Sequence, residues 1–208
     1  MIEKYLVSTC LFVIDEMNER FEGVTNDKLK DVADSFTEAD LVVRLGYPFK
    51  SMANFSTGKG ADILLKTKTR DFEIQVKYLK NYDSEKGTRS NKSNWKALQK
   101  DFDWLTSQII EGNKNNRAIV LGWFTGNERF SQIAQLGKGT GRYPLIDETK
   151  KKYFPFLNPS SSRVTDISYQ YSDAYNIQSI HIPGHTETGI NCMFLGSKTD
   201  KFHFAIYW

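Results

Sequence analysis

Apolar and polar residues alternate from Phe72 to Leu79, a pattern typical of a strand with one buried face. A shorter apolar run, Ala61–Leu65, precedes this strand, and the polar residues Lys68–Asp71 separate the two runs. The pattern therefore predicts a hairpin. Because successive side chains of a strand point to opposite faces, its second strand carries a row of polar side chains on one face: Glu73, Gln75 and Lys77.

The length of the hairpin loop decides which residues face one another. With a two-residue loop at Thr69-Arg70, Asp62 lies opposite Lys77, and Lys66 lies opposite Glu73. A three-residue loop sends Asp62 to the other face. The two-residue register gathers a carboxylate, an amide and a lysine on one side of the sheet.

Helical spacing of apolar residues predicts the elements before the hairpin. An amphipathic helix occupies residues 2–22, and a second helical stretch follows Thr25-Asn26-Asp27. Two overlapping capping signals, Ser35–Glu38 and Thr37–Asp40, indicate that a further helix starts there and runs to about Leu45.

The elements after the hairpin are a helix and several strands. Ser93 or Asn94 caps a helix that ends at Gly112, and the apolar run Arg117–Phe124 has the composition of a buried strand. Two more strands are predicted near the C-terminus: Ile190–Leu195 and Phe202–Trp208.

This order predicts an α/β (α+β) fold with a central mixed β-sheet flanked by helices. The 208 residues suit a single domain, since no repeat, linker or low-complexity tract divides the chain. We expect a core at about 25–125, preceded by the N-terminal helix. A C-terminal extension of loops and strands, 126–208, would follow the core.

Composition adds a local charge to this outline. The chain is 39% hydrophobic, enough for a sizeable core, and its net charge is only +3. Between Lys66 and Lys100, however, the sequence contains ten basic residues and only four acidic ones. This excess favours a polyanionic substrate, although a solvated lysine-rich face is the alternative. The candidate phosphate-binding residues are Lys80, Lys86, Arg89, Lys92 and Lys96.

Other signals favour a cytoplasmic protein without zinc. Cys10 and Cys192 lie in apolar contexts, as expected for buried free thiols in a reducing compartment. We find no signal-peptide pattern and no apolar run long enough to cross a membrane. His181 and His185 lie four residues apart, but Pro183 and the following glycine exclude a helix that presents both.

The hairpin resembles the PD-(D/E)xK nuclease superfamily, which has a restriction-endonuclease-like fold. The signature of that family is an acidic residue at the end of one strand and an acidic-x-Lys tripeptide on the next. Asp62 corresponds to the first acid and Gln75-Val76-Lys77 to the tripeptide, with glutamine in the acidic slot. Some members carry this Gln-x-Lys form. Ala61 stands where the family usually has proline.

The resemblance implies a Mg²⁺-dependent (or Mn²⁺-dependent) endodeoxyribonuclease, with DNA favoured over RNA. The metal ligands would be Asp62, the amide oxygen of Gln75 and the backbone carbonyl of Val76, which suit a hard cation. Lys77 would orient or help to deprotonate the attacking water and stabilise the phosphate in the transition state.

Two further carboxylates are candidates for the charge that Gln75 lacks. Glu73 lies on the polar face of the same strand. Glu38 has two interpretations: a metal carboxylate supplied by the preceding helix, or a capping-box glutamate, which we favour.

The alternative function is a weak or inactive nuclease-fold protein that binds nucleic acid or a protein partner. Gln75 in the acidic slot is the feature that favours it. A homodimer is left open.

Overall fold

The computed structural model describes most of the chain, namely residues 2–50, 54–56, 61–79, 92–113, 116–125, 130–139 and 143–208. The candidate phosphate-binding residues Lys80, Lys86 and Arg89 lie outside these ranges.

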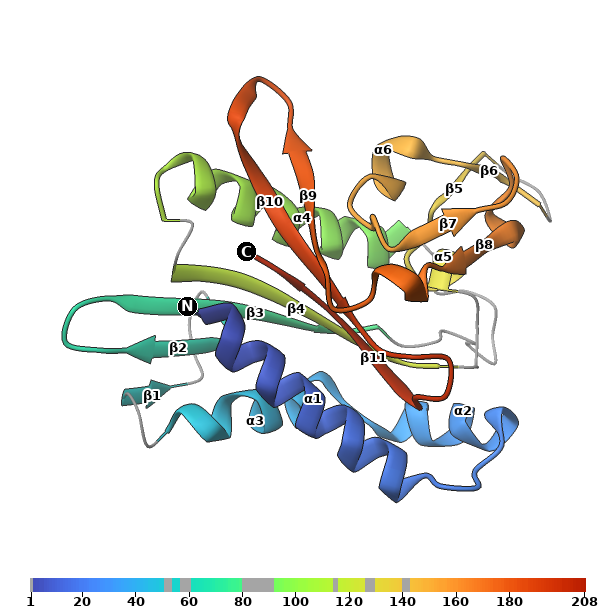
Figure 1. Ribbon diagram of the computed structural model, residues 1–208, viewed down its shortest axis with the longest axis horizontal. Coiled ribbons are helices and arrows are strands. Elements are labelled where there is room, and N and C mark those ends of the chain that lie inside the picture. Colours follow the sequence, from blue (N-terminus) through green and yellow to red (C-terminus); the bar gives the residue numbers. More distant parts are fainter. Residues whose placement is uncertain are drawn as a thin grey trace.

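A seven-stranded sheet forms the centre of the protein, with the strand order β1-β2-β3-β4-β11-β10-β9 (Figure 1). Neighbouring strands of this sheet are antiparallel except for β3 and β4, which are parallel. The mixed sheet and the α+β class confirm the predicted fold class. The strands are β1 (Asn54–Ser56), β2 (Ile63–Lys66), β3 (Asp71–Tyr78), β4 (Arg117–Phe124), β9 (Ile177–Ile182), β10 (His185–Leu195) and β11 (Phe202–Tyr207).

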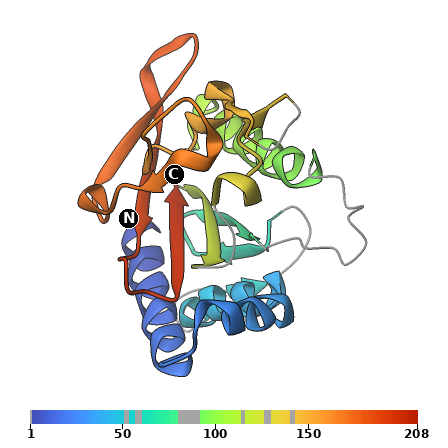
Figure 2. The same ribbon diagram turned by 90° about the vertical axis from the view of Figure 1, so that its right-hand side faces the viewer.

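Helices cover both faces of the sheet (Figures 1 and 2). On one face lie α1 (Ile2–Arg20), α2 (Asn26–Ser35) and α3 (Glu38–Gly46), and on the other lies α4 (Lys92–Ile110). Because successive side chains of a strand point to opposite faces of the sheet, one strand contributes to the core on each face. Along β4, Ala118, Val120 and Phe124 pack with α1–α3, whereas Ile119, Leu121 and Trp123 pack on the side of α4.

Short elements between β4 and β9 lie beside α4 and complete the second core (Figure 1). Several aromatic side chains of this region are buried there; Phe154 and Phe156, for example, are fully inaccessible to solvent. The elements are α5 (Phe130–Ile133), β5 (Gly137–Lys138), β6 (Leu145–Ile146), α6 (Glu148–Lys151), β7 (Leu157–Pro159) and β8 (Ile167–Tyr169), with 3-10 turns at Val164–Asp166 and Tyr171–Asp173. A further 3-10 turn, Tyr47–Phe49, follows α3 and belongs to the first core.

The C-terminal strands belong to the central sheet and do not form a separate extension of the core. β11 pairs with β4 on one side and with β10 on the other, so residues 202–207 lie in the middle of the sheet. The strands that the sequence predicted in this region are present. The expected division between a core that ends near residue 125 and an extension that begins at residue 126 is not seen, because strands from both parts form one sheet. None of the helices in the described ranges is long and apolar enough to cross a membrane.

The register of the β2–β3 hairpin differs from the predicted one. Lys66 pairs with Asp71 and Leu64 with Glu73, so the loop has four residues, Thr67–Arg70. The backbone N–H of Thr67 donates to the carbonyl oxygen of Arg70 at 3.1 Å, and the Thr67 hydroxyl donates to the same oxygen at 2.6 Å. The predicted pairs Asp62–Lys77 and Lys66–Glu73 are therefore wrong.

The prediction of which paired side chains share a face of the sheet is nevertheless correct. The register differs by two residues, and a two-residue shift returns each side chain to its original face. The paired residues end at Ile63–Ile74, and Asp62 lies just before β2. Its carboxylate nevertheless reaches β3, where it binds the Val76 N–H.

Candidate active site

The end of β3 extends past β2, and two of its backbone N–H groups are bound by carboxylates. The N–H of Val76 donates to Asp62 Oδ2 at 2.7 Å, and the N–H of Tyr78 donates to Glu38 Oε2 at 3.1 Å. Buried backbone donors need partners, and here two acidic side chains supply them where no strand does. Hydrogen bonds to ionised acceptors are stronger than neutral ones, so both carboxylates are held firmly against this edge.

Lys77 lies between two acidic side chains that come from different helices. Its Nζ is 3.5 Å from Glu38 Oε1 and 3.7 Å from Asp101 Oδ2. The side chains of Lys77 and Asp101 are 23% and 13% exposed, whereas that of Glu38 is 41% exposed. We refer to Glu38, Asp62, Lys77 and Asp101 as the Lys77 cluster.

The pKa values of Lys77 and Asp101 are both raised, but for different reasons. Burial alone lowers the pKa of Lys77, but Asp101, Glu38 and Asp62 together outweigh burial and raise it. Burial also raises the pKa of Asp101; Lys77 opposes this rise, and Asp62 and Glu38 add to it. Lys77 is therefore an ammonium group at neutral pH, suited to stabilising negative charge.

The structure brings most of the predicted motif together. Asp62 and Lys77 belong to the same cluster, and Gln75 is a half-buried residue two positions before Lys77 on β3. The side chain of Val76 is buried in the core, and its amide is bound to Asp62. The role of the Val76 carbonyl as a metal ligand stays a prediction.

Glu38 is part of the cluster, which corrects the capping role that we favoured. The capping box of α3 is formed by Thr37 and Asp40: the Asp40 N–H donates to Thr37 Oγ1 at 3.2 Å, and the Thr37 N–H donates to Asp40 Oδ2 at 2.9 Å. As the first residue of α3, Glu38 directs its carboxylate to Lys77 and the Tyr78 amide.

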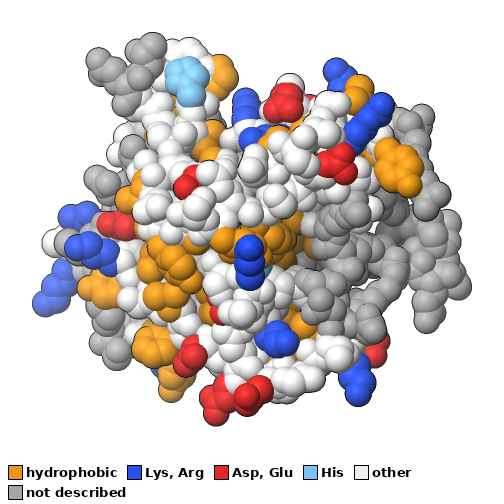
Figure 3. Space-filling view, turned by 45° about the vertical axis from the view of Figure 1, so that its right-hand side comes forward, with side chains coloured by type: hydrophobic (Ala, Val, Ile, Leu, Met, Phe, Trp, Pro, Cys, Tyr) orange, Lys and Arg blue, Asp and Glu red, His pale blue; other side chains and the backbone are white. Residues whose placement is uncertain are grey.

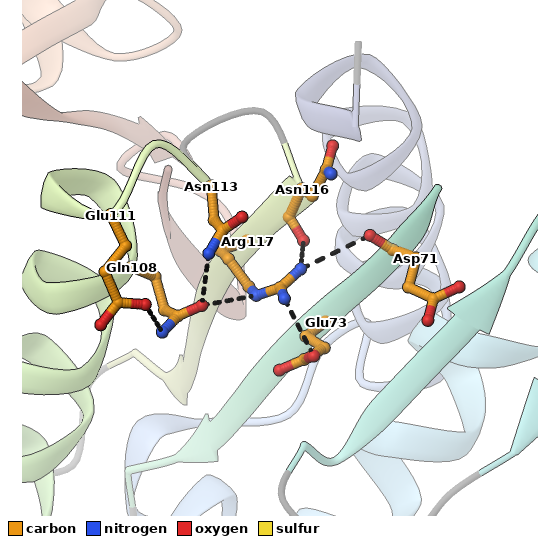
Figure 4. A network of polar contacts seen from close by, with 7 residues as sticks. All are labelled: Asp71, Glu73, Gln108, Glu111, Asn113, Asn116 and Arg117. Atoms are coloured by element: carbon orange, nitrogen blue, oxygen red, sulfur yellow. Dashed lines mark hydrogen bonds and ion pairs between the residues drawn. The ribbon is translucent and has the colours of Figure 1, made fainter. Parts of the chain in front are cut away.

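Glu73 lies outside the cluster. Its Oε1 is 3.0 Å from Arg117 Nη2, and Arg117 also donates to Gln108 Oε1 and to the Asp71 carbonyl oxygen (Figure 4). Glu73 and Lys77 are four residues apart on one strand, a separation of roughly 13 Å. The structure thus places Glu73 in a polar network at the other end of β3, away from the carboxylates that it was expected to assist.

Asp101 is the residue that sequence reasoning missed. It lies on α4 beside the buried residues Leu98, Phe102 and Leu105, which follow the i, i+4, i+7 spacing of an apolar helix face. An acid at position i+3 of such a face points toward the sheet. That placement was the only available signal, since nothing local to residue 101 indicates a partner 24 residues earlier.

The predicted phosphate-binding lysines are only partly described. Lys92 begins α4, and the exposed Lys96 lies one turn further along. On the face drawn in Figure 3, the described Lys and Arg side chains are interspersed with Asp and Glu, without a continuous basic patch. The prediction of a phosphate-binding surface around these residues stays a prediction.

The cluster fits a hard divalent cation by its donor chemistry. Carboxylate and amide oxygens, as in Glu38, Asp62 and Gln75, are the ligands that Mg²⁺ and Mn²⁺ prefer. A carboxylate has about four acceptor positions, so its bond to an N–H group leaves capacity for a cation. Among the described residues, however, no three His, Cys, Asp or Glu side chains are already grouped as a metal site.

Comparison with known proteins gives no further guidance. Neither the known protein families, nor the curated proteins, nor the solved structures contain a match to this chain.

Proposed function

We propose that the protein is a divalent-cation-dependent nuclease that hydrolyses phosphodiester bonds in DNA, with the Lys77 cluster as its active site. One observation carries the proposal: Glu38 from α3, Lys77 from β3 and Asp62 from the residues just before β2 converge at the open end of β3. Lys77 is partly buried and its pKa is raised by the acids around it, and charged groups gathered in this way are characteristic of functional sites.

The residues that would hold the cation are Asp62, Glu38 and Gln75. When bound, a divalent cation neutralises phosphate charge and makes a water molecule more acidic. Asp62 and Glu38 are already fixed by the Val76 and Tyr78 amides, so little ordering of these side chains is needed. The neutral Gln75 adds an oxygen dipole without adding a negative charge.

Lys77 supplies positive charge to the reaction. Its three N–H donors allow it to bind a phosphate oxygen and the attacking water while it keeps one carboxylate contact. Because its pKa is raised, the group remains protonated at neutral pH. Its role is therefore to stabilise the negative charge that develops on phosphate, where a preorganised donor is most effective.

Cleavage of plasmid DNA with Mg²⁺ or Mn²⁺ tests the proposal. Asp62→Asn keeps an oxygen for the Val76 amide but removes the charge, so it should abolish cleavage and weaken cation binding in calorimetry. The matched control is Asp71→Asn, an exposed acid at the other end of β3, which should cleave normally. Wild-type cleavage by the Asp62→Asn variant would exclude the cluster as the active site.

A second candidate function is binding of nucleic acid without cleavage. It is favoured by Gln75 in the acidic slot and by carboxylates that contact Lys77 and backbone amides rather than one another. A salt-sensitive gel shift by a wild-type protein that cuts neither with Mg²⁺ nor with Mn²⁺ would select this function over the first.

A further inference from the structure

Lys77 is held from both faces of the sheet. Glu38 reaches it from α3, which covers one face, and Asp101 reaches it from α4, which covers the other (Figure 1). A lysine side chain has four rotatable bonds, and two opposed partners restrict it more than either alone.

The two acidic partners of Lys77 differ in their other hydrogen bonds and in their exposure to solvent. Glu38 divides its carboxylate between Lys77 and the Tyr78 amide and is the more exposed of the two. Asp101 is mostly buried, and its Oδ2 accepts no hydrogen bond within the described part of the chain, with Lys77 Nζ at 3.7 Å. A buried carboxylate without a cation is costly, so Asp101 depends on Lys77 more strongly than Glu38 does.

The backbone at Asp101 is fixed by the core. The next residue, Phe102, is stacked on Tyr153 with ring centroids 4.4 Å apart and meets the edge of Tyr207 at 5.0 Å. Leu98 and Leu105 are buried one turn to either side. Asp101 therefore cannot follow Lys77 if the lysine moves, and it defines where the ammonium group lies.

We propose that Asp101 is the positioning residue for Lys77, holding the ammonium group in place when Glu38, still bound to the Tyr78 amide, gives up its contact with Lys77 for one with a cation. Asp101 touches neither the cation nor the substrate. The consequence for cleavage rests on the proposed function, whereas the anchoring itself does not.

The anchoring is measured directly from the NMR signal of the Lys77 ammonium group, assigned by its loss in Lys77→Arg. An ammonium group held by a buried partner exchanges slowly with water and gives a sharp signal. We expect this signal in the wild type and in Glu38→Gln, and its loss in Asp101→Asn. Asp103→Asn, an exposed acid on the same helix, is the matched control and should keep the signal.

Three results would overturn the proposal: no Lys77 signal in the wild type, its loss in Glu38→Gln, or its persistence in folded Asp101→Asn. Should Asp101→Asn not fold, the double variant Glu38→Gln/Asp62→Asn decides the question, because Asp101 is then the one acid of the Lys77 cluster left to hold the signal, and loss of the signal in this variant overturns the proposal.

Cleavage gives an independent second measurement. Asp101→Asn should lower kcat by about 10- to 100-fold, the effect typical of residues that orient a functional group, with KM for DNA unchanged. Asp101→Glu should restore part of the loss, because it returns the charge to the same side of Lys77. A change in KM alone would contradict a positioning role, whereas a wild type that cleaves nothing refutes the proposed function and leaves the NMR result to judge Asp101.

Discussion

Replacing Lys77 with methionine should destabilise the protein by about 3 kcal/mol at pH 7. Methionine keeps much of the length of the side chain, so the main loss is the positive charge between Asp101 and Glu38. Leaving one partner of a buried ion pair alone costs about 3–5 kcal/mol. Glu38 is 41% exposed and screened by water, so we place the loss at the lower end and assign most of it to Asp101.

Urea denaturation at pH 7 measures this loss, which for a chain of this size corresponds to roughly 6–12 °C in Tm. Lys68→Met, an exposed lysine in the loop of the same hairpin, is the control and should change stability by less than about 0.5 kcal/mol. Adding Asp101→Asn to Lys77→Met should recover most of the loss, because the uncompensated buried charge is removed. A Lys77→Met variant as stable as the wild type, or a double variant no more stable than the single one, would refute the reasoning.

Two further predictions concern His203 and Gln75. Burial lowers the pKa of His203 from its usual 6.5 to about 4, so folding favours the neutral ring. The contribution of His203 to stability should therefore be constant above pH 6.5 and fall as the pH drops toward 4. In urea denaturation the free energy of unfolding should fall by up to about 1.4 kcal/mol per pH unit. His203→Phe should flatten this slope, whereas the exposed control His181→Gln should not. Equal slopes in the wild type and both variants would contradict the assignment to His203. Gln75→Glu should tighten Mg²⁺ binding in calorimetry and keep or raise cleavage, whereas Gln75→Ala should depress both, because a carboxylate attracts the cation more strongly than an amide dipole. If both substitutions are silent, Gln75 is not a ligand.

The faces of the hairpin could be read from the sequence, but its register could not. Alternation along residues 72–79 fixes which side chains share a face, and that property survives any even change in loop length. The loop length depends on the turn that Thr67 and Arg70 make with each other. Neither residue is a glycine, proline or asparagine, so no strong turn signal distinguished a four-residue loop from a two-residue one.

The role of Glu38 was ambiguous because two capping signals overlap. Ser35–Glu38 and Thr37–Asp40 both have the required spacing, and local sequence does not rank them. Tertiary contacts decide: Asp40 closes the capping box, and Glu38 meets Tyr78 and Lys77, residues about 40 positions later. Asp101 was missed for the same reason, since its partner Lys77 lies on another element.

The Lys77 cluster also offers a physical reason for glutamine in the acidic slot. With all three carboxylates ionised, Glu38, Asp62 and Asp101 carry three negative charges, and Lys77 offsets one of them. The remaining charge of minus two equals what one divalent cation neutralises. An acid at position 75 would raise the surplus in a partly buried site, where unpaired charge is most costly. Asp101 thus supplies from α4 the charge that Gln75 lacks on β3, so under the proposed function a glutamine at residue 75 leaves the total charge of the site balanced.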